Sequence, residues 1–354
     1  MVDWLAGNRI RGTNTERTST TGFNPVSGGW KELGRSSGTA PSITSLANKR
    51  YLMILGHAIR GSGAYGAVAM RFNNDTSGNY AKRTSEHGNT DSARIDQIKM
   101  QALVEHSNVT GNHSFNVQYV ANLATKEKLM IGHGVHSSSL GSGYAVGRQE
   151  SVFKWDNTSD AINRVDMFDG ESDTWGTSSE CVVLGWDPDD THTTNFWEEL
   201  ASVTLGSAGD TLDSGTIAAK KYLWVQVFAI ATGNLDNCKI RYNGSSSSDY
   251  AFRASNNGGA DSTNINESGI VYNGANAAQN HFVNIFIINI SAREKLSIGH
   301  TVRDGGAGVG NSPDRKEWGG KWDITGSQIT SIQAVNAGAG SFDTGSIIKV
   351  WGSN

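Results

Sequence analysis

Short runs of apolar residues alternate with polar turn segments along the whole chain. The clearest runs cover residues 49–55, 115–120, 220–227 and 282–287, and each has the length of a strand and contains many β-branched or aromatic residues. The segments between them are rich in Gly, Asn, Ser and Asp, which tolerate turn conformations. Because no stretch shows a convincing helical period, the pattern predicts an all-β protein.

The same pattern occurs twice. Residues 71–73 and 80–85 recur as 241–243 and 250–255, and the run Glu-Lys-Leu-x-Ile-Gly-His at 127–133 recurs at 294–300. A repeat of this length exceeds the 20 to 50 residues of a solenoid unit, so each copy should form a domain with its own core. The sequence therefore predicts two tandem domains related by internal duplication.

The repeat sets the domain plan. Residues 28–186 are predicted to form a first β-sandwich, 187–195 a linker and 196–354 a second β-sandwich. About eight strands per copy, spaced by turn signals, favour a jelly-roll-like sandwich. Residues 1–27 are polar and have no counterpart in the second copy, which predicts an extended N-terminal arm. Its apolar side chains are candidate contacts with a neighbouring subunit, and a frayed tail is the alternative: Trp4, Leu5 and Ile10.

Charge and composition exclude several classes of protein. The net charge of −4 gives no basic excess to neutralise phosphates, so nucleic acid is not an expected partner. The start of the sequence does not resemble a secretory leader, and no apolar run is long enough for a membrane span. We expect a soluble protein synthesised in the cytoplasm, with no membrane partner. Cys181 and Cys238 have no repeat equivalents and should be small buried residues rather than a disulfide.

Four arginines occupy repeated hairpin positions, and alternation places each pair on one sheet face: Arg71, Arg83, Arg241 and Arg253. Such a pair could bind a carboxylate, a sulfate or a sugar acid through bidentate hydrogen bonds. Alternatively, the arginines could pair with the repeated acids Glu127 and Glu294, or with Glu150 and Glu317, and fix the packing. The structural interpretation is favoured, because residues kept in both copies should serve what the copies share.

Histidine is repeated at His133 and His300, where each continues a row of apolar side chains on its strand, Leu129 and Ile131 in the first copy and Leu296 and Ile298 in the second. These rows are expected to face inward, which predicts hydrogen-bonded core or strand-end histidines. The spacing of His133 and His136 could hold a metal, but the second copy has Arg303 there and no Cys or carboxylate cluster accompanies either copy. We therefore expect neither a metal nor a cofactor.

No catalytic motif is present: the sequence lacks a Gly-x-Ser-x-Gly elbow, a His-Glu-x-x-His motif, a phosphate loop and a dinucleotide fingerprint. The protein is predicted not to be an enzyme and to have no catalytic residues. An enzyme acting on a polysaccharide ranks last among the alternatives, because nothing in the sequence points to it. Sequence alone does not exclude it, since the spacing of a catalytic carboxylate pair is set by tertiary structure.

Ten tryptophans invite comparison with sugar-binding surfaces. Six match between the copies and are assigned to core or interface: Trp30, Trp155, Trp186, Trp197, Trp322 and Trp351. The others have no match and are candidate exposed contact residues: Trp4, Trp175, Trp224 and Trp318.

Several of these motifs together resemble a family. Trp-Lys-Glu-Leu-Gly at 30–34, Arg-Phe-Asn-Asn-Asp-Thr at 71–76, Glu-Lys-Leu-x-Ile-Gly-His, Lys-Trp-Asp and a terminal Val-Trp-Gly are similar to uncharacterised proteins of marine phages and related viruses, encoded among virion or tail-fibre genes. The resemblance covers both copies and the N-terminal residues 4–11. It implies a virion-associated role and brings no catalytic residues.

We therefore expect a non-enzymatic structural protein on the surface of the virion, as a capsid decoration or fibre component. Its expected partners are itself, in a cyclic homo-oligomer for which a trimer is one option, and other virion proteins. The two-sided apolar strands at Tyr51 and Tyr222 would supply subunit contacts. One alternative is a carbohydrate-binding module of a tail or fibre that recognises a host-surface glycan. A capsid subunit built from a double jelly roll ranks below it.

Overall fold

The computed structural model describes residues 29–62, 66–101, 103–106, 109, 111–171, 174–187, 190, 194–274 and 277–354. Every regular element in these ranges is a β-strand, so the all-β prediction is confirmed. Among these same residues, no helix is long and apolar enough to span a membrane. The predicted arm, with Trp4, Leu5 and Ile10, lies outside the described residues, as does part of the predicted linker.

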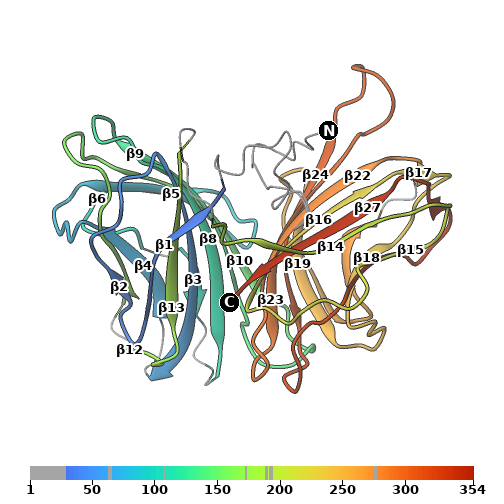
Figure 1. The fold of residues 1–354 in the computed structure, drawn as a ribbon, viewed down its shortest axis with the longest axis horizontal. Coiled ribbons are helices and arrows are strands. Elements are labelled where there is room, and N and C mark those ends of the chain that lie inside the picture. The colour runs from blue at the N-terminus through green and yellow to red at the C-terminus, as the bar shows by residue number, and fades with distance from the viewer. Residues whose placement is uncertain are drawn as a thin grey trace. The chain divides into compact units, whose positions relative to one another are not determined.

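The chain forms two compact units. The first contains residues up to 86 together with 90–134 and 149–199, and the second contains 87–89, 135–148 and 200–354. Each unit pairs a large antiparallel sheet with a small one, and Figure 1 shows these layers for each unit. The fold is thus two β-sandwiches.

The larger sheet of the first unit has the order β1 (Lys31–Ser37), β13 (Glu180–Trp186), β3 (Tyr51–Ser62), β8 (His113–Ala121), β9 (Lys128–His136), β10 (Gly147–Trp155), β5 (Tyr80–Glu86), β6 (Ser92–Gln97), with β12 (Thr174–Trp175) beside β3. Its smaller sheet has the order β2 (Ser42–Ile43), β11 (Val165–Asp169), β4 (Gly66–Phe72), β7 (Glu105–His106).

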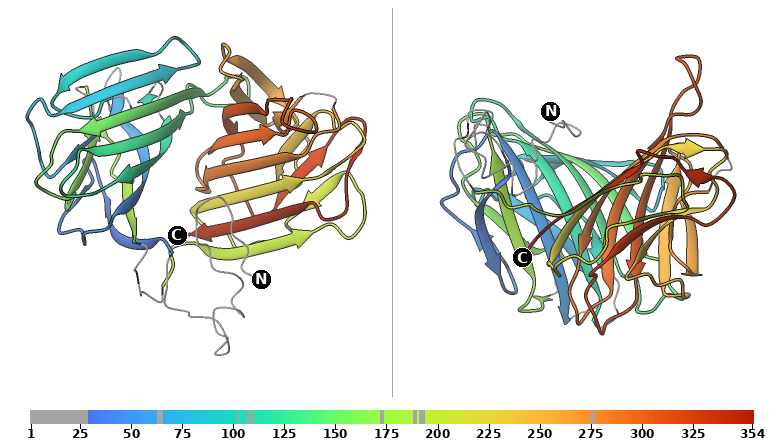
Figure 2. Two further views of the ribbon diagram at one scale, coloured as in Figure 1. Left: turned by 90° about the horizontal axis from the view of Figure 1, so that it is seen from above. Right: turned by 45° about the vertical axis from the view of Figure 1, so that its right-hand side comes forward.

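The second unit repeats this plan. Its larger sheet, whose strands run side by side in Figure 2, has the order β14 (Glu198–Thr204), β27 (Ile347–Ser353), β16 (Tyr222–Ala229), β22 (His281–Ile288), β23 (Lys295–Arg303), β24 (Asp314–Trp322), β19 (Tyr250–Asn256), β20 (Ser262–Glu267). The smaller sheet is β15 (Thr211–Asp213), β25 (Ile332–Asn336), β18 (Cys238–Tyr242), β21 (Ile270–Asn273), and β17 (Ala231–Thr232) pairs with β26 (Ser341–Phe342). Strand for strand, the two orders correspond.

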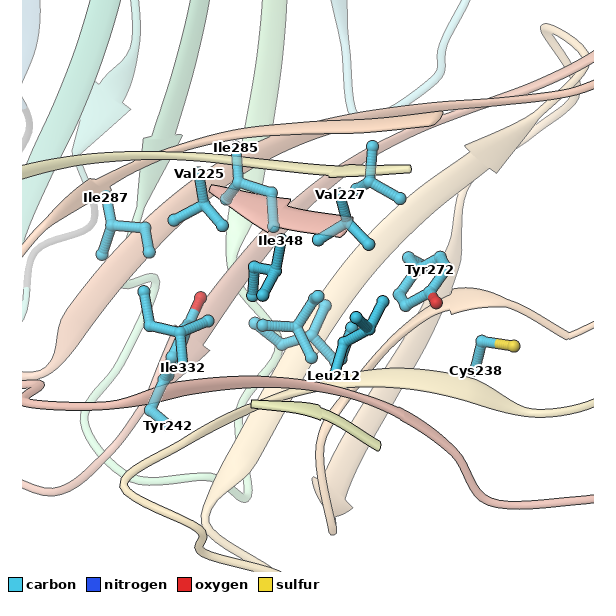
Figure 3. Packing of buried hydrophobic residues seen from close by; sticks show 14 of the residues in the cluster. Leu212, Val225, Val227, Cys238, Tyr242, Tyr272, Ile285, Ile287, Ile332 and Ile348 are labelled. Atoms are coloured by element: carbon cyan, nitrogen blue, oxygen red, sulfur yellow. The ribbon is translucent and has the colours of Figure 1, made fainter. Parts of the chain in front are cut away.

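Each sandwich has its own apolar core between its sheets. In the second unit, alternate residues of β16 and β22 point inward, and Figure 3 shows Val225 and Ile285 facing Leu212 and Ile332 of the smaller sheet. Burying one such side chain contributes about 1.5 to 3 kcal/mol. Both cysteines are free and buried, as predicted.

The same side-chain network holds the turn between β4 and β5 and the turn between β18 and β19, each of which connects the smaller sheet to the larger one. Asn243 has a left-handed φ of 51°, and its carboxamide donates to the carbonyl of Gln328 at 2.9 Å and accepts from the amide of Thr330 at 2.7 Å. Asn73 makes the matching set of contacts with residues 161 and 163. Both turns are therefore fixed by an asparagine that tolerates this conformation.

Candidate functional site

The prediction that the repeated arginines share one face of a hairpin is wrong, because β4 and β18 lie in the smaller sheets and β5 and β19 in the larger ones. The first matched pair, Arg71 and Arg241 on β4 and β18, contacts backbone carbonyls. Arg241 Nε donates to the carbonyl of Ser268 at 2.9 Å. Arg71 Nε lies 3.5 Å from the carbonyl of Ile98, and its guanidinium lies 4.7 Å from the centre of the Phe168 ring. These contacts tie strands of the sandwich together.

The second pair differs between the copies. Arg253 Nε donates to the carbonyl of Val146 at 2.9 Å. Arg83 is largely exposed, and its nearest carboxylate is that of Asp91 at 3.9 Å. The side chain that is engaged in the second copy is thus left at the surface in the first.

The repeated acids Glu127 and Glu294 pair with lysines, whereas Glu317 contacts Arg315 at 2.7 Å. Glu127 lies 3.1 Å from Lys154, and Glu294 lies 3.4 Å from Lys321. The reason is strand order: each glutamate directly precedes β9 or β23, and its lysine lies on the neighbouring strand β10 or β24. Opposite charges then meet across one face of the sheet.

The two pairs differ sharply in burial. The side chains of Lys154 and Glu127 are 44% and 40% exposed, whereas those of Lys321 and Glu294 are 0% and 2% exposed. Burial raises the pKa of Glu294 and lowers the pKa of Lys321, and each partner opposes the shift of the other. A buried ion pair is tolerated only where its remaining hydrogen-bonding capacity is satisfied.

That capacity is satisfied by the segment between β9 and β10, which belongs to the second compact unit. Lys321 Nζ donates to the carbonyl of Ser139 at 2.6 Å, and the amide of Gly141 donates to the carboxylate of Glu294. The amide of Ser142 donates to Asp323 at 2.9 Å. We name residues 135–148 the covering segment.

The covering segment makes further contacts on both sides of this ion pair. Arg148 donates to the carboxylate of Asp261 at 2.6 Å through one terminal nitrogen and at 3.3 Å through Nε. A Cβ added at Gly319 would lie 3.0 Å from the side chain of Val135, so the backbone of β24 approaches this segment closely. The outer side of β23 and β24 is therefore a docking surface with a charged centre and apolar surroundings.

The repeated histidines lie on outward-facing rows, and the prediction of inward rows is wrong. In the first copy Leu129 and Ile131 are exposed, while Lys128 and Met130 are buried. His133 is half-buried, as is His300 in the second copy. The prediction took the apolar row that contains Leu129 and Ile131 to be the inward one. Side chains alternate between the two faces of a strand, so choosing the row one residue away assigns every side chain to the opposite face.

Three of the four tryptophans predicted to be exposed contacts, Trp175, Trp224 and Trp318, are buried, which corrects the prediction for them, while Trp4 lies outside the described residues. Trp175 packs in the first core and Trp318 in the second. Trp224 Nε1 donates to Asn284 at 2.6 Å, and its ring stacks on Phe286 at 5.4 Å between centres. Absence of a repeat equivalent marks a local difference in packing and does not indicate exposure.

A polar cavity of about 290 Å³ lies in the second unit at the ends of β23 and β24. Arg303 binds Asp314 at 2.8 Å, and burial beside Arg303 lowers the pKa of Lys316 to about 8. Amides, hydroxyls and cations complete the lining: Asn256, Asn257, Tyr272, Asn273, Gly274, Thr301 and Arg315. Such a lining can hydrogen-bond a small polar ligand.

Sequence reasoning missed the partners of the docking surface. Asp261 lies in a loop without a motif, and Ser142 binds Asp323 through its backbone amide. Arg148 begins the repeated run Arg148-Gln149-Glu150, matched by residues 315–317, but the sequence did not indicate its partner. Asp323 belongs to the repeated Lys-Trp-Asp run, which was the available signal.

Comparisons with known proteins give little beyond this. No family model matches the chain, and no curated protein matches it. Among solved structures, domains LG4-5 of the mouse laminin alpha1 chain are 11% identical, cover 94% of this chain and 92% of their own, and align with a TM-score of 0.17. The NanC porin is 11% identical, covers 73% of this chain and 98% of its own, and aligns with a TM-score of 0.11. At these scores neither likeness carries an argument about function.

Proposed function

We propose that this chain is a non-enzymatic structural protein of a virus particle, a capsid decoration or fibre component that works through contacts between subunits. The observation that carries the proposal is how the repeated polar residues are used. Asn243 and Asn73 close matching turns, and Lys321 and Lys154 pair with matching acids. Residues kept for the fold and for a docking surface suit an assembly protein.

The sequence resemblance to virion and tail-fibre proteins supplies the setting, and we place the protein in the virion. We further propose that each sandwich is of the jelly-roll type and that the two arose by duplication. The matching strand orders support the duplication, and the alternation of β1 to β5 between the two sheets supports the jelly-roll type.

The proposal is tested on purified particles of the virus that encodes the chain. Quantitative mass spectrometry should find the chain in a fixed number of copies per particle. Its absence from intact particles would contradict the proposal. A copy number equal to that of the principal shell subunit would instead indicate the double jelly-roll capsid role.

A carbohydrate-binding role is the second candidate, and the polar cavity favours it. Asn256, Asn273 and Arg303 offer amide and guanidinium groups that suit sugar hydroxyls or an acidic sugar. A glycan array with the wild-type chain and with Asn273→Asp is the test. Binding that is lost in the variant would support a host-recognition module, and no binding to any glycan would remove this candidate.

A further inference from the structure

The docking surface of the second unit has an uncovered counterpart in the first. We name the outer side of β23 and β24 the covered face, and the outer side of β9 and β10 the open face. Leu296 of the covered face is 0% exposed, whereas Leu129, at the matching position of the open face, is 58% exposed. Ile298 and Ile131 differ in the same way, at 5% and 56%. The open face therefore has the side chains of an interface but lies at the surface.

The covering segment has a counterpart in the second copy, residues 302–315, which runs from the end of β23 to the start of β24. We name it the distal segment. Gly141 and Gly308 have φ values of 88° and 81° at the same point of the two loops. Each accepts a hydrogen bond from the residue three positions later, at 3.3 Å and 3.2 Å. The two segments thus share a local turn.

Two apolar residues that are buried in the covering segment have exposed matches in the distal segment. Val135 of the covering segment is 0% exposed, and its match Val302 in the distal segment is 41% exposed. Val146 is fully buried, and its match Pro313 is exposed. The distal segment thus keeps one of these two valines and leaves it exposed.

The ion pair between Arg148 and Asp261 also has matching residues in the other copy, and these lie at two separate places. Arg148 and Asp261 bind each other with side chains 7% and 1% exposed. Their matches are Arg315, which is 61% exposed and contacts Glu317 at 2.7 Å, and Asp91, which is 50% exposed. Arg315 lies on the distal segment, and Asp91 lies beside the open face.

We propose that the distal segment of one chain docks on the open face of a second copy of the chain, head to tail. Arg315 then binds Asp91 of the neighbour, and the amide of Gly308 donates to Glu127, as Gly141 does to Glu294 within one chain. The inference rests on the proposed function, because it names the partner through which subunit contacts form. Each chain offers one segment and one face, so the contact repeats and either closes a ring or extends a fibre.

A second copy is the occupant that the chain itself specifies. The covering segment and covered face fit in shape and charge, and duplication supplied a second segment and a second face with matching charged residues. The open face has Val152 where the covered face has Gly319, so the distal segment must seat around that side chain. Residues 1–28 and an unrelated protein are the competing occupants, and the test separates them.

The test is sedimentation velocity of the full chain across a range of concentrations, with a charge swap. The wild type should form species heavier than the 37.8 kDa chain. Asp91→Arg and Arg315→Asp should each weaken association at least about tenfold, since each leaves a charge opposed by a like charge. The double variant restores the pair between neighbours and should recover most of the association. Asp210→Arg, at an exposed site next to the smaller sheet, is the matched control and should change nothing.

Three results would overturn the proposal: a chain that stays monomeric at all concentrations, association that ignores both single variants, or a double variant no better than either single one. If deletion of residues 1–28 converts a monomer into an assembly sensitive to Asp91→Arg, the N-terminal segment is the occupant and the second copy is not. Retention of a monomeric chain in particles would reject this interface and leave the proposed function intact.

Discussion

His281 shows how one side chain links burial to acid sensitivity. Its ring is fully buried in β22, Nε2 accepts a hydrogen bond from the Asn273 amide at 3.2 Å, and the ring lies edge-on to Tyr272. Burial, with a contribution from Arg303, lowers the pKa of His281 to about 4. The native sandwich therefore holds this imidazole neutral.

We predict that His281 makes the protein less stable in acid. The unfolded chain takes up the proton near pH 6.5 and the folded chain only near pH 4, so this contribution is complete above about pH 6.5 and is lost as the pH falls toward 4. Between pH 7 and pH 4.5 the free energy of unfolding should fall by about 2 to 3 kcal/mol from this group alone. Urea unfolding of the wild type and of His281→Gln measures the difference, and equal pH slopes would contradict it.

Two matched lysines are buried for structural reasons. Lys295 Nζ donates to the carbonyls of Arg293 and Ile324 at 2.8 Å and 2.5 Å, and it lies 5.6 Å from the centre of the Trp322 ring. Lys128 makes the corresponding contacts in the first unit. Each ammonium therefore joins the loop before its strand to the loop after the next strand.

Replacing either lysine by methionine should destabilise its sandwich by about 2 to 4 kcal/mol at pH 7, because two buried carbonyls lose their donor while the apolar stem is kept. Chemical denaturation of Lys295→Met and Lys128→Met measures this cost. Lys126→Met is the control, since Lys126 is exposed and should change stability by less than about 0.5 kcal/mol. Equal stability of all three variants would refute the assigned role.

At the scale of the strand, Asn73 and Asn243 have two roles in the turns that they close: each adopts a left-handed backbone conformation, and each forms side-chain hydrogen bonds. Substitutions can separate the two roles. Asn243→Gly keeps the left-handed conformation and removes the side-chain hydrogen bonds, whereas Asn243→Ala removes both. We expect losses of about 2 to 3 kcal/mol for glycine and about 1 kcal/mol more for alanine. The urea midpoints of the two variants and the wild type measure these losses. A glycine variant as stable as the wild type would show that the side-chain hydrogen bonds contribute nothing to stability.

The sequence predicted the strands and the two sandwiches well, because both depend on local alternation and on matching runs. It misplaced the last strand of the first copy. Matching Trp186 to Trp351 aligned the two ends, yet Gly185 pairs with Leu52 as Gly352 pairs with Leu223. The glycines therefore correspond, and the tryptophans do not. A slip of two residues keeps every side chain on its face, so alternation cannot reveal it.

The docking surface was beyond sequence reasoning for a different reason. Leu129 and Leu296 are the same residue at the same repeat position, and only the second is covered. Coverage is decided by a loop that is distant in sequence and acts largely through its backbone, as Gly141 and Ser142 do. Contacts made by backbone groups cannot be predicted from the pattern of side chains in the sequence.

For the whole molecule, the two apolar cores are separate, but two strands are shared. Ile54 lies in the first core and Ile285 in the second. Strands β9 and β10 each belong mainly to the first unit, while their ends at 135–136 and 147–148 belong to the second. Unfolding of the second unit would release the covering segment and pull on the middle of the larger sheet of the first.

We therefore predict one coupled unfolding transition for the full chain. Ile54→Ala and Ile285→Ala should each cost about 2 to 5 kcal/mol by leaving a cavity in one core, and either should lower the midpoint of the same transition. Differential scanning calorimetry checks this, because a coupled transition gives equal calorimetric and van't Hoff enthalpies in the wild type and in both variants. Two resolved transitions, of which each variant moves only one, would show that the shared strands do not couple the sandwiches, and that each copy behaves as an autonomous domain despite the covering segment.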